Sequence, residues 1–172
     1  MPSGYNSTYW ANFGLGTYPG TVDPETPQMI LSYVAEEDVP FGRPVCRGPT
    51  MEQLTCVDGI QGQSGIIDIT NPEVHAELTQ FLGIALCDPT AHGLADSMYR
   101  RGDAVSVMIG GTVYVTNSRG YVEAGSPVYV SVVDSSFGEL DEFAAPIAGA
   151  VWLDNVRQNS IGRIRLVGVN QV

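Results

Sequence analysis

Apolar and polar residues alternate along much of the chain from about residue 39 onward. Valine and isoleucine occupy every second position of residues 104–109, and the same period of two recurs in residues 112–116. A period of two is typical of strands that bury one face. The Gly110-Gly111 pair between these stretches allows the positive φ of a two-residue turn, so we predict a hairpin there.

Three predicted strands begin with the same short pattern. A glycine precedes one polar residue, then Pro or Ala, then valine, as in "GRPV" (42–45), "GDAV" (102–105) and "GSPV" (125–128). The glycine relieves backbone strain in the turn, and the first position of a strand can be occupied by a residue without an N–H. We therefore expect each Pro or Ala to begin a strand.

Further strands are predicted in the second half of the chain. The apolar runs 81–87 and 146–153 are each interrupted by one glycine, as expected where a strand bends tightly. Apolar residues alternate with arginines in 161–169, the last predicted strand. The fold class is therefore mostly β: a small antiparallel barrel or sandwich of about seven or eight short strands, with at most one or two short helices.

The N-terminal segment has a different character. Among Gly, Asn, Ser and Thr it carries closely spaced aromatic residues without a sustained period: Tyr5, Tyr9, Trp10, Phe13 and Tyr18. Aromatic side chains at this density rarely remain in water, so the segment either folds back over the domain or docks on a neighbouring molecule. We divide the chain into an extended aromatic-rich arm, residues 1–38, and a β-barrel domain, residues 39–172.

Two segments have more than one interpretation. Residues 24–38 place apolar side chains at helical spacing over about two turns, which fits a short helix or a structured arm equally: Met29, Ile30, Tyr33 and Val34. Residues 68–80 favour a helix of one to two turns, with Asn71 as cap and Pro72 at the first position. The alternative for this second segment is an irregular loop.

The charge of the chain narrows the choice of partners. There are 19 acidic residues against 8 basic ones, all of them arginine, for a net charge of −11. Such a chain offers no cationic face for nucleic acid or for an anionic membrane surface. No run approaches the ~20 apolar residues of a membrane span, and the N-terminus lacks the features of a signal peptide. An acidic exterior suits a partner with basic patches.

Candidate reactive residues are few. Cys46, Cys56 and Cys87 are an odd number without close pairing, so we expect free thiols. The segment "CDPTAH" (87–92) brings a cysteine near His92, but a zinc site needs about four ligands, and His75 stands far away. The acidic run 134–142 does not match a calcium loop. We expect no catalytic residues, no metal ligands and no cofactor.

The tripeptide Arg101-Gly102-Asp103 matches an adhesion motif by sequence alone. Each residue also has a local role, because Gly102 can form the turn and Asp103 can cap it by accepting hydrogen bonds from nearby N–H groups. We interpret the tripeptide as turn chemistry.

Five stretches occur in an order that resembles the structural cement (capsid decoration) proteins of tailed bacteriophages: "PFGRPVCRG", "FLGIALCDPT", "YRRGDAVSVMIGGTVYV", "AGSPVYV" and "APIAGAVWLDN…IGRIRLVGV". The resemblance spans residues 39–169. It implies a non-enzymatic virion protein with a small β-barrel core. Such a protein is made in the host bacterial cytoplasm and binds the outside of an icosahedral shell where subunits meet. Its partner is the major capsid protein, and a homo-oligomer is expected, with a trimer favoured.

The resemblance gives the aromatic residues of the arm a role. We expect Tyr5, Tyr9, Trp10, Phe13 and Tyr18 to contact the capsid, because Tyr and Trp are common anchors of protein interfaces. The alternative is that these side chains cover the protein's own barrel. Other functions compatible with a small barrel are a head–tail connector, a tail protein or a small-ligand-binding protein.

Overall fold

The fold is that of a computed structural model. It describes residues 18–47, 53–56, 81–88, 97–131, 133–141 and 144–167. These residues form eleven strands: β1 (Met29–Ala35), β2 (Val39–Pro40), β3 (Pro44–Arg47), β4 (Gln53–Cys56), β5 (Phe81–Ala85), β6 (Met98–Tyr99), β7 (Ala104–Arg119), β8 (Pro127–Ser131), β9 (Phe137–Gly138), β10 (Ala144–Trp152) and β11 (Ser160–Leu166). None of the described residues is helical. The mostly-β prediction is confirmed, and this part of the chain contains no helix that could cross a membrane.

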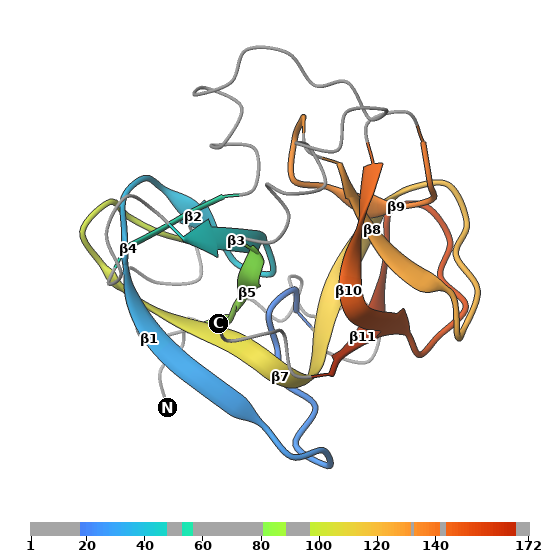
Figure 1. The fold of residues 1–172 in the computed structure, drawn as a ribbon, viewed down its shortest axis with the longest axis horizontal. Coiled ribbons are helices and arrows are strands. Elements are labelled where there is room, and N and C mark those ends of the chain that lie inside the picture. The colour runs from blue at the N-terminus through green and yellow to red at the C-terminus, as the bar shows by residue number, and fades with distance from the viewer. Residues whose placement is uncertain are drawn as a thin grey trace, which may run out of the picture.

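Nine of these strands form one sheet that folds into two halves (Figure 1). The strand order is β1-β4-β3-β5-β7-β11-β10-β8-β9, and both β1 and β9 also pair with β7. The N-terminal half therefore consists of β1, β4, β3, β5 and the first part of β7. The C-terminal half consists of the second part of β7 with β11, β10, β8 and β9. Each half is a partial ring of strands, and the two rings share β7.

β7 is the long strand common to both halves, and it corrects the predicted hairpin. It continues through Gly110-Gly111 for 16 residues in all. β1 pairs with its first part, from Ala104 to Gly110, and β11 pairs with its second part, from Gly111 to Asn117. The glycine pair is thus the point where β7 passes from one half to the other. Because neighbouring strands pair with β7 before and after the glycine pair, the chain stays extended there.

The glycine at this crossing is required by a close approach. Gly111 has φ +123°, and a Cβ there would lie 2.8 Å from the carbonyl oxygen of Pro27. Buried and less buried residues alternate on both sides of the glycine pair, as predicted, but the buried side chains enter different cores. Val105 and Val107 are buried in the N-terminal half, whereas Val113 and Val115 are buried in the C-terminal half.

The two halves have separate hydrophobic cores with a common wall. The N-terminal core contains Tyr18, Ala35, Val39, Phe41, Val45, Leu82, Ala85, Tyr99, Val105, Val107 and Ile109. Leu82 and Ala85 of β5 face this core, and Phe81 and Ile84 of the same strand face the other one. All five residues of β5 are buried for this reason. A strand buried on both faces reads as a continuous apolar run, which is what the sequence shows.

The shared pattern at strand starts is confirmed. Gly42, Gly102 and Gly125 all have positive φ, at +74°, +92° and +86°. The strands that follow begin at Pro44, Ala104 and Pro127. The glycine that interrupts β10, Gly149, lies within the break in pairing between Pro146 and Val151, as the predicted bend requires.

The helical alternative for residues 24–38 is wrong. Met29–Ala35 is strand β1, which pairs antiparallel with β7 over six residue pairs. Tertiary pairing with β7 overrides the local helical spacing. Residues 18–38 therefore pack into the domain. The predicted arm stays a prediction for residues 1–17, which lie outside the described residues. The predicted helix at 68–80 also lies outside them.

We expect substitution at the crossing point to be more costly than substitution at an open turn. Gly111→Ala combines a positive φ with a steric clash, so it should lower the free energy of unfolding by about 2 kcal/mol or more. Gly102→Ala is the matched control, because its Cβ would meet nothing within 4 Å. Only backbone strain remains there, at about 1 kcal/mol. Urea denaturation measures both, and equal losses would contradict the role assigned to Gly111.

Candidate functional site

The structure places one of the five aromatic residues predicted to contact a capsid. Tyr5, Tyr9, Trp10 and Phe13 lie outside the described residues. Tyr18 is 3% exposed and belongs to the N-terminal core. Its environment is the one that the alternative interpretation expects, with the ring covering the protein's own domain. A role of the other four residues in capsid contact stays a prediction.

Tyr18 is held by a short series of aromatic contacts. Its ring packs edge-on against Phe41, with centroids 6.2 Å apart, and Phe41 packs edge-on against Tyr99 at 5.2 Å. The Tyr18 hydroxyl donates to Oγ of Ser97. The Tyr99 hydroxyl donates to the carbonyl of Leu86 at 2.9 Å. These buried polar tips are therefore satisfied, and the ring of Tyr18 is fixed at the point where the described chain begins.

The segment that follows Tyr18 is tied to β7 by main-chain hydrogen bonds. The N–H of Gly20 donates to the Tyr114 carbonyl at 2.7 Å, and the N–H of Tyr114 donates to the Thr21 carbonyl at 2.9 Å. The N–H of Asp23 donates to the Thr112 carbonyl at 3.0 Å. We call residues 18–28 the strap. It runs beside the second part of β7 before the chain enters β1.

One arginine joins the strap to the C-terminal half. Arg163 of β11 donates to Oδ2 of Asp23 at 3.4 Å and to Oδ1 of Asp154 at 2.7 Å. Its hydrogen bonds hold the pKa of Asp154 below the ordinary value, and Asp154 in turn raises the pKa of Arg163. This cluster is a structural ion-pair network, since both carboxylates share the one guanidinium.

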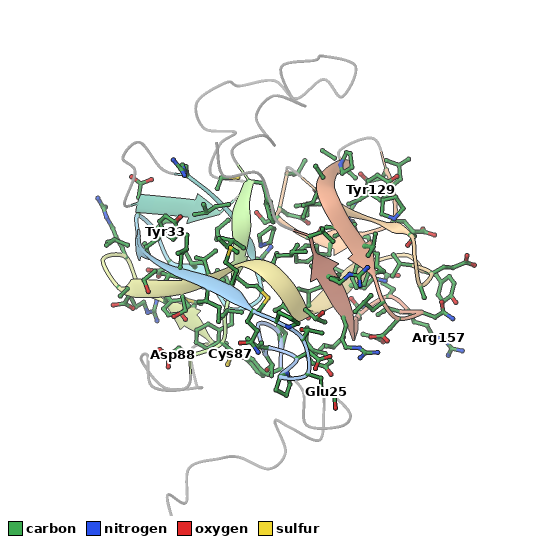
Figure 2. All side chains as sticks on the ribbon, turned by 60° about the horizontal axis from the view of Figure 1, so that its bottom comes forward. Glu25, Tyr33, Cys87, Asp88, Tyr129 and Arg157 are labelled. Atoms are coloured by element: carbon green, nitrogen blue, oxygen red, sulfur yellow. The ribbon has the colours of Figure 1, made fainter. Side chains whose placement is uncertain are left out.

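The Cys87 thiol is not activated as a nucleophile. Cys46 and Cys87 are free cysteines. Cys87 and Asp88 follow β5 (Figure 2), and burial together with the Asp88 charge raises the pKa of the Cys87 thiol to about 11. A thiol with such a pKa contains little of the nucleophilic thiolate at neutral pH. The two histidines lie outside the described residues, and the described residues contain no group of three potential metal ligands.

The Arg101-Gly102-Asp103 tripeptide forms the turn before β7, as predicted. The main-chain N–H of Arg100 donates to Oδ2 of Asp103 at 2.6 Å, and Gly102 has φ +92°. Arg101 donates its main-chain N–H to Asp38 at 3.1 Å. Each residue therefore has the structural task that turn chemistry assigns to it.

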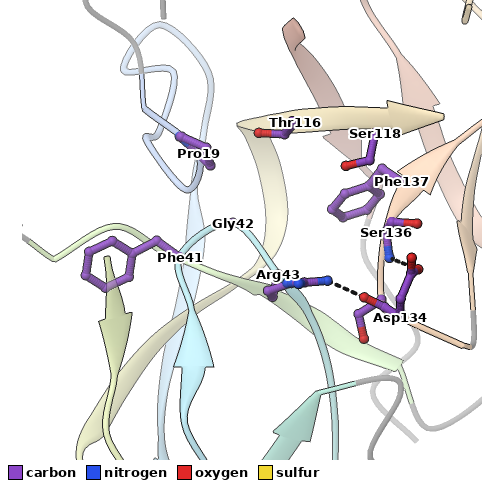
Figure 3. A pocket seen from close by; sticks show the side chains of 10 residues that line it. Pro19, Phe41, Gly42, Arg43, Thr116, Ser118, Asp134, Ser136 and Phe137 are labelled. Carbon is purple, nitrogen blue, oxygen red and sulfur yellow. Dashed lines mark hydrogen bonds between the residues drawn. The ribbon is translucent and has the colours of Figure 1, made fainter. Parts of the chain in front are cut away.

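A cleft of about 330 Å³ lies where the two halves meet (Figure 3). One wall comes from residues 19 and 41–43, and the other from residues 116, 118 and 134–137. Arg43 reaches across and donates to the carbonyl of Asp134. The lining combines two phenylalanines, a proline and a glycine with polar residues, namely three serines, one threonine, Arg43 and Asp134. Ligand-binding proteins use concave sites of such mixed lining, but the described walls show no cluster of activated groups.

The exposed apolar surface concentrates on β1. Met29, Ile30, Leu31 and Val34 are between 38% and 54% exposed. β1 pairs with β7 on one side, whereas on the other side it pairs with β4 only at Val34 and Ala35. Among the described residues, Met29–Tyr33 thus presents an open edge. Sequence reasoning missed this feature because apolar residues on both faces of a strand do not alternate.

Comparison with known proteins identifies the family. The model of the family described as "Structural cement protein (E217 gp24/Pam3 gp6)" matches residues 5–167. A chain from "The capsid of Myoviridae Phage XM1" has a similar fold, with a TM-score of 0.62 and 17% sequence identity over 90% of this chain and 92% of that one. No curated protein sequence matches. Since the family model covers nearly the whole chain, the protein belongs to the phage structural cement proteins.

The ion-pair network predicts a pH-dependent loss of stability. The pKa of Asp154 is lowered in the folded state from 3.8, so its contribution is complete above that value and is lost as the pH falls through the folded pKa. Asp154→Asn should therefore lower the free energy of unfolding at pH 7 by about 0.5–1 kcal/mol, a value reduced by solvent screening.

At pH 3 the difference between the variant and the unmodified chain should be smaller. Urea denaturation at the two pH values measures it. Glu123→Gln is the control, because Glu123 is exposed and its carboxylate forms no ion pair among the described residues. A constant Asp154→Asn difference at both pH values would contradict the network.

Proposed function

We propose that the protein binds the outer surface of an icosahedral phage capsid and reinforces the junctions between its subunits without catalysing a reaction. Its partner is the major capsid protein. The observation that carries this proposal is the match of the structural cement family to residues 5–167. The XM1 capsid chain supports the fold. The inert thiol and the absence of a metal-ligand cluster among the described residues agree with a structural role.

The described architecture suits a protein that reinforces an existing shell. Two cores that share one wall give a rigid body, so the surface it presents to the shell is preformed. A rigid surface loses little conformational entropy on binding. The domain contributes this surface, and the uncharged N-terminal segment contributes aromatic anchors: Tyr5, Tyr9, Trp10 and Phe13. Tyr18 fixes the base of that segment on the domain.

The net charge of the chain suits a basic region on the shell. A charge of −11 without any lysine opposes association of the protein with itself and favours encounter with cationic surfaces. On the capsid we propose a homo-oligomer, with a trimer favoured. This assignment rests on the resemblance to cement proteins, several of which occupy local symmetry axes.

Co-sedimentation with shells of the phage that encodes the protein tests the function. We expect saturable binding to expanded shells, at a ratio fixed by the capsid lattice, and no binding to unexpanded procapsids. Raising the salt concentration should weaken binding, since the screening length is about 8 Å at physiological ionic strength. A chain that binds neither form of shell would reject the proposal.

Removal of the arm should separate binding from folding. Deletion of residues 1–13 removes the four aromatic anchors but keeps Tyr18, so we expect weaker shell binding with an unchanged melting temperature. Tyr18→Ala is the matched variant. It deletes a core side chain and should lower the free energy of unfolding by about 3 kcal/mol or more. Thermal unfolding and co-sedimentation measure both variants, and a lowered melting temperature of the deletion would mean that the arm covers its own domain.

A further inference from the structure

β1 exposes apolar side chains on both of its faces. Met29 is 54% exposed, Ile30 41% and Leu31 38%, although they are consecutive and point alternately to opposite sides of the strand. Among residues 29–33, only Tyr33 packs against the N-terminal core. The core therefore does not account for the apolar character of Met29–Leu31. A long apolar edge strand favours unwanted pairing unless a partner covers it.

The same stretch offers main-chain groups for pairing. From Ile30 to Val34 each residue pairs in regular antiparallel register with β7, so alternate N–H and C=O groups point away from β7. On that outer side, among the described residues, β4 occupies only the positions of Val34 and Ala35. In Figure 1, β1 lies along the rim of the N-terminal half. Among the described strands, none pairs with the outer side of Met29–Tyr33, so this side can accept an extended segment.

The charge pattern around this edge selects the partner. No charged residue occurs between Glu25 and Glu36, whereas acidic residues stand at both ends of the strand. Glu25 precedes β1 and Tyr33 lies near the other end (Figure 2). Glu36 and Glu37 follow β1 directly, and the next residue, Asp38, pairs with Arg100 at 2.7 Å. The edge is therefore an apolar stretch between two acidic ends.

A second copy of the chain fits this pattern poorly. Antiparallel pairing of two β1 strands would bring the acidic end of one copy to the acidic end of the other. Parallel pairing would place Glu36 beside Glu36. Like charges in adjacent strands are destabilising, and the nearby Arg100 is already paired with Asp38. A partner with arginine or lysine at both ends of an uncharged stretch would instead place opposite charges beside Glu25 and Glu36, which favours binding.

We propose that the open edge of β1 binds an extended segment of the capsid subunit by strand addition. The segment has an uncharged, apolar centre flanked by basic residues, and its main chain pairs with Met29–Tyr33. Main-chain hydrogen bonds supply part of the affinity, and the side chains beside the edge supply specificity. This inference rests on the proposed function and names the surface and the partner chemistry that it uses.

A charge placed in the middle of the edge should block the addition. Ile30→Lys puts a cation where the partner segment is apolar, and lysine on an edge strand opposes pairing. Leu140→Lys is the matched control, because Leu140 is 63% exposed and lies beyond β9 in the C-terminal half. We expect about tenfold or more weaker binding of Ile30→Lys to expanded shells, unchanged binding of Leu140→Lys and unchanged melting temperatures for both.

Neutralising the acidic ends tests the basic flanks. The double variant Glu25→Gln, Glu36→Gln should bind shells more weakly at low salt and lose affinity less steeply as salt is raised. Glu123→Gln, exposed in the loop before β8, removes one charge elsewhere and should keep the original salt dependence. An unchanged salt dependence of the double variant would contradict the proposal that basic residues flank the bound segment.

Amide hydrogen exchange on shell-bound protein reports strand addition directly. We expect slower exchange at outward-facing amides of residues 29–33 in the bound state than in the free state. If the unmodified chain binds shells while Ile30→Lys binds equally well and these amides stay unprotected, this inference is overturned and the proposed function stands. Failure of the unmodified chain to bind any shell overturns both. Protection that depends on protein concentration in the absence of shells would assign the edge to a second copy and overturn the shell segment as its occupant.

Discussion

The pairing of β7 along both halves is the constraint on which the rest of the structure depends. Its first part pairs with β1 and β5, and its second part pairs with β11. Both cores take side chains from it, so neither half can change its strand order without disturbing the other. The close approach of Pro27 to Gly111 fixes the position at which β7 passes between them. The result is one domain with two cores that share β7.

The strap anchors the start of the described chain on both halves. Tyr18 is buried with Phe41 and Tyr99, and main-chain hydrogen bonds from the strap to β7 follow at once. Arg163 adds an ion pair to Asp23 from β11. The start of the described chain is therefore bound to both halves.

The surface around β1 combines exposed apolar residues with acidic residues at both ends of the strand. β1 carries exposed apolar residues at an edge that no other described strand covers from Met29 to Tyr33, which by itself favours aggregation. The acidic residues at both ends of the strand and the absence of lysine oppose pairing between copies. The same charges leave the edge accessible to a partner of opposite charge. In the strand addition that we propose, these charges would act both against pairing between copies and in favour of a basic partner.

Local chemistry in the sequence determined the strand starts, the turn at Arg101-Gly102-Asp103 and the acidic surface, because glycine backbones and net charge act without distant partners. It did not determine whether Gly110-Gly111 turns or crosses, since either outcome needs a glycine and only β1 and β11 decide between them. Residues 29–35 became a strand through pairing with β7, against their helical spacing. The tertiary structure likewise decided that Tyr18 belongs to the core, because burial depends on Phe41 and Tyr99, which are distant in sequence.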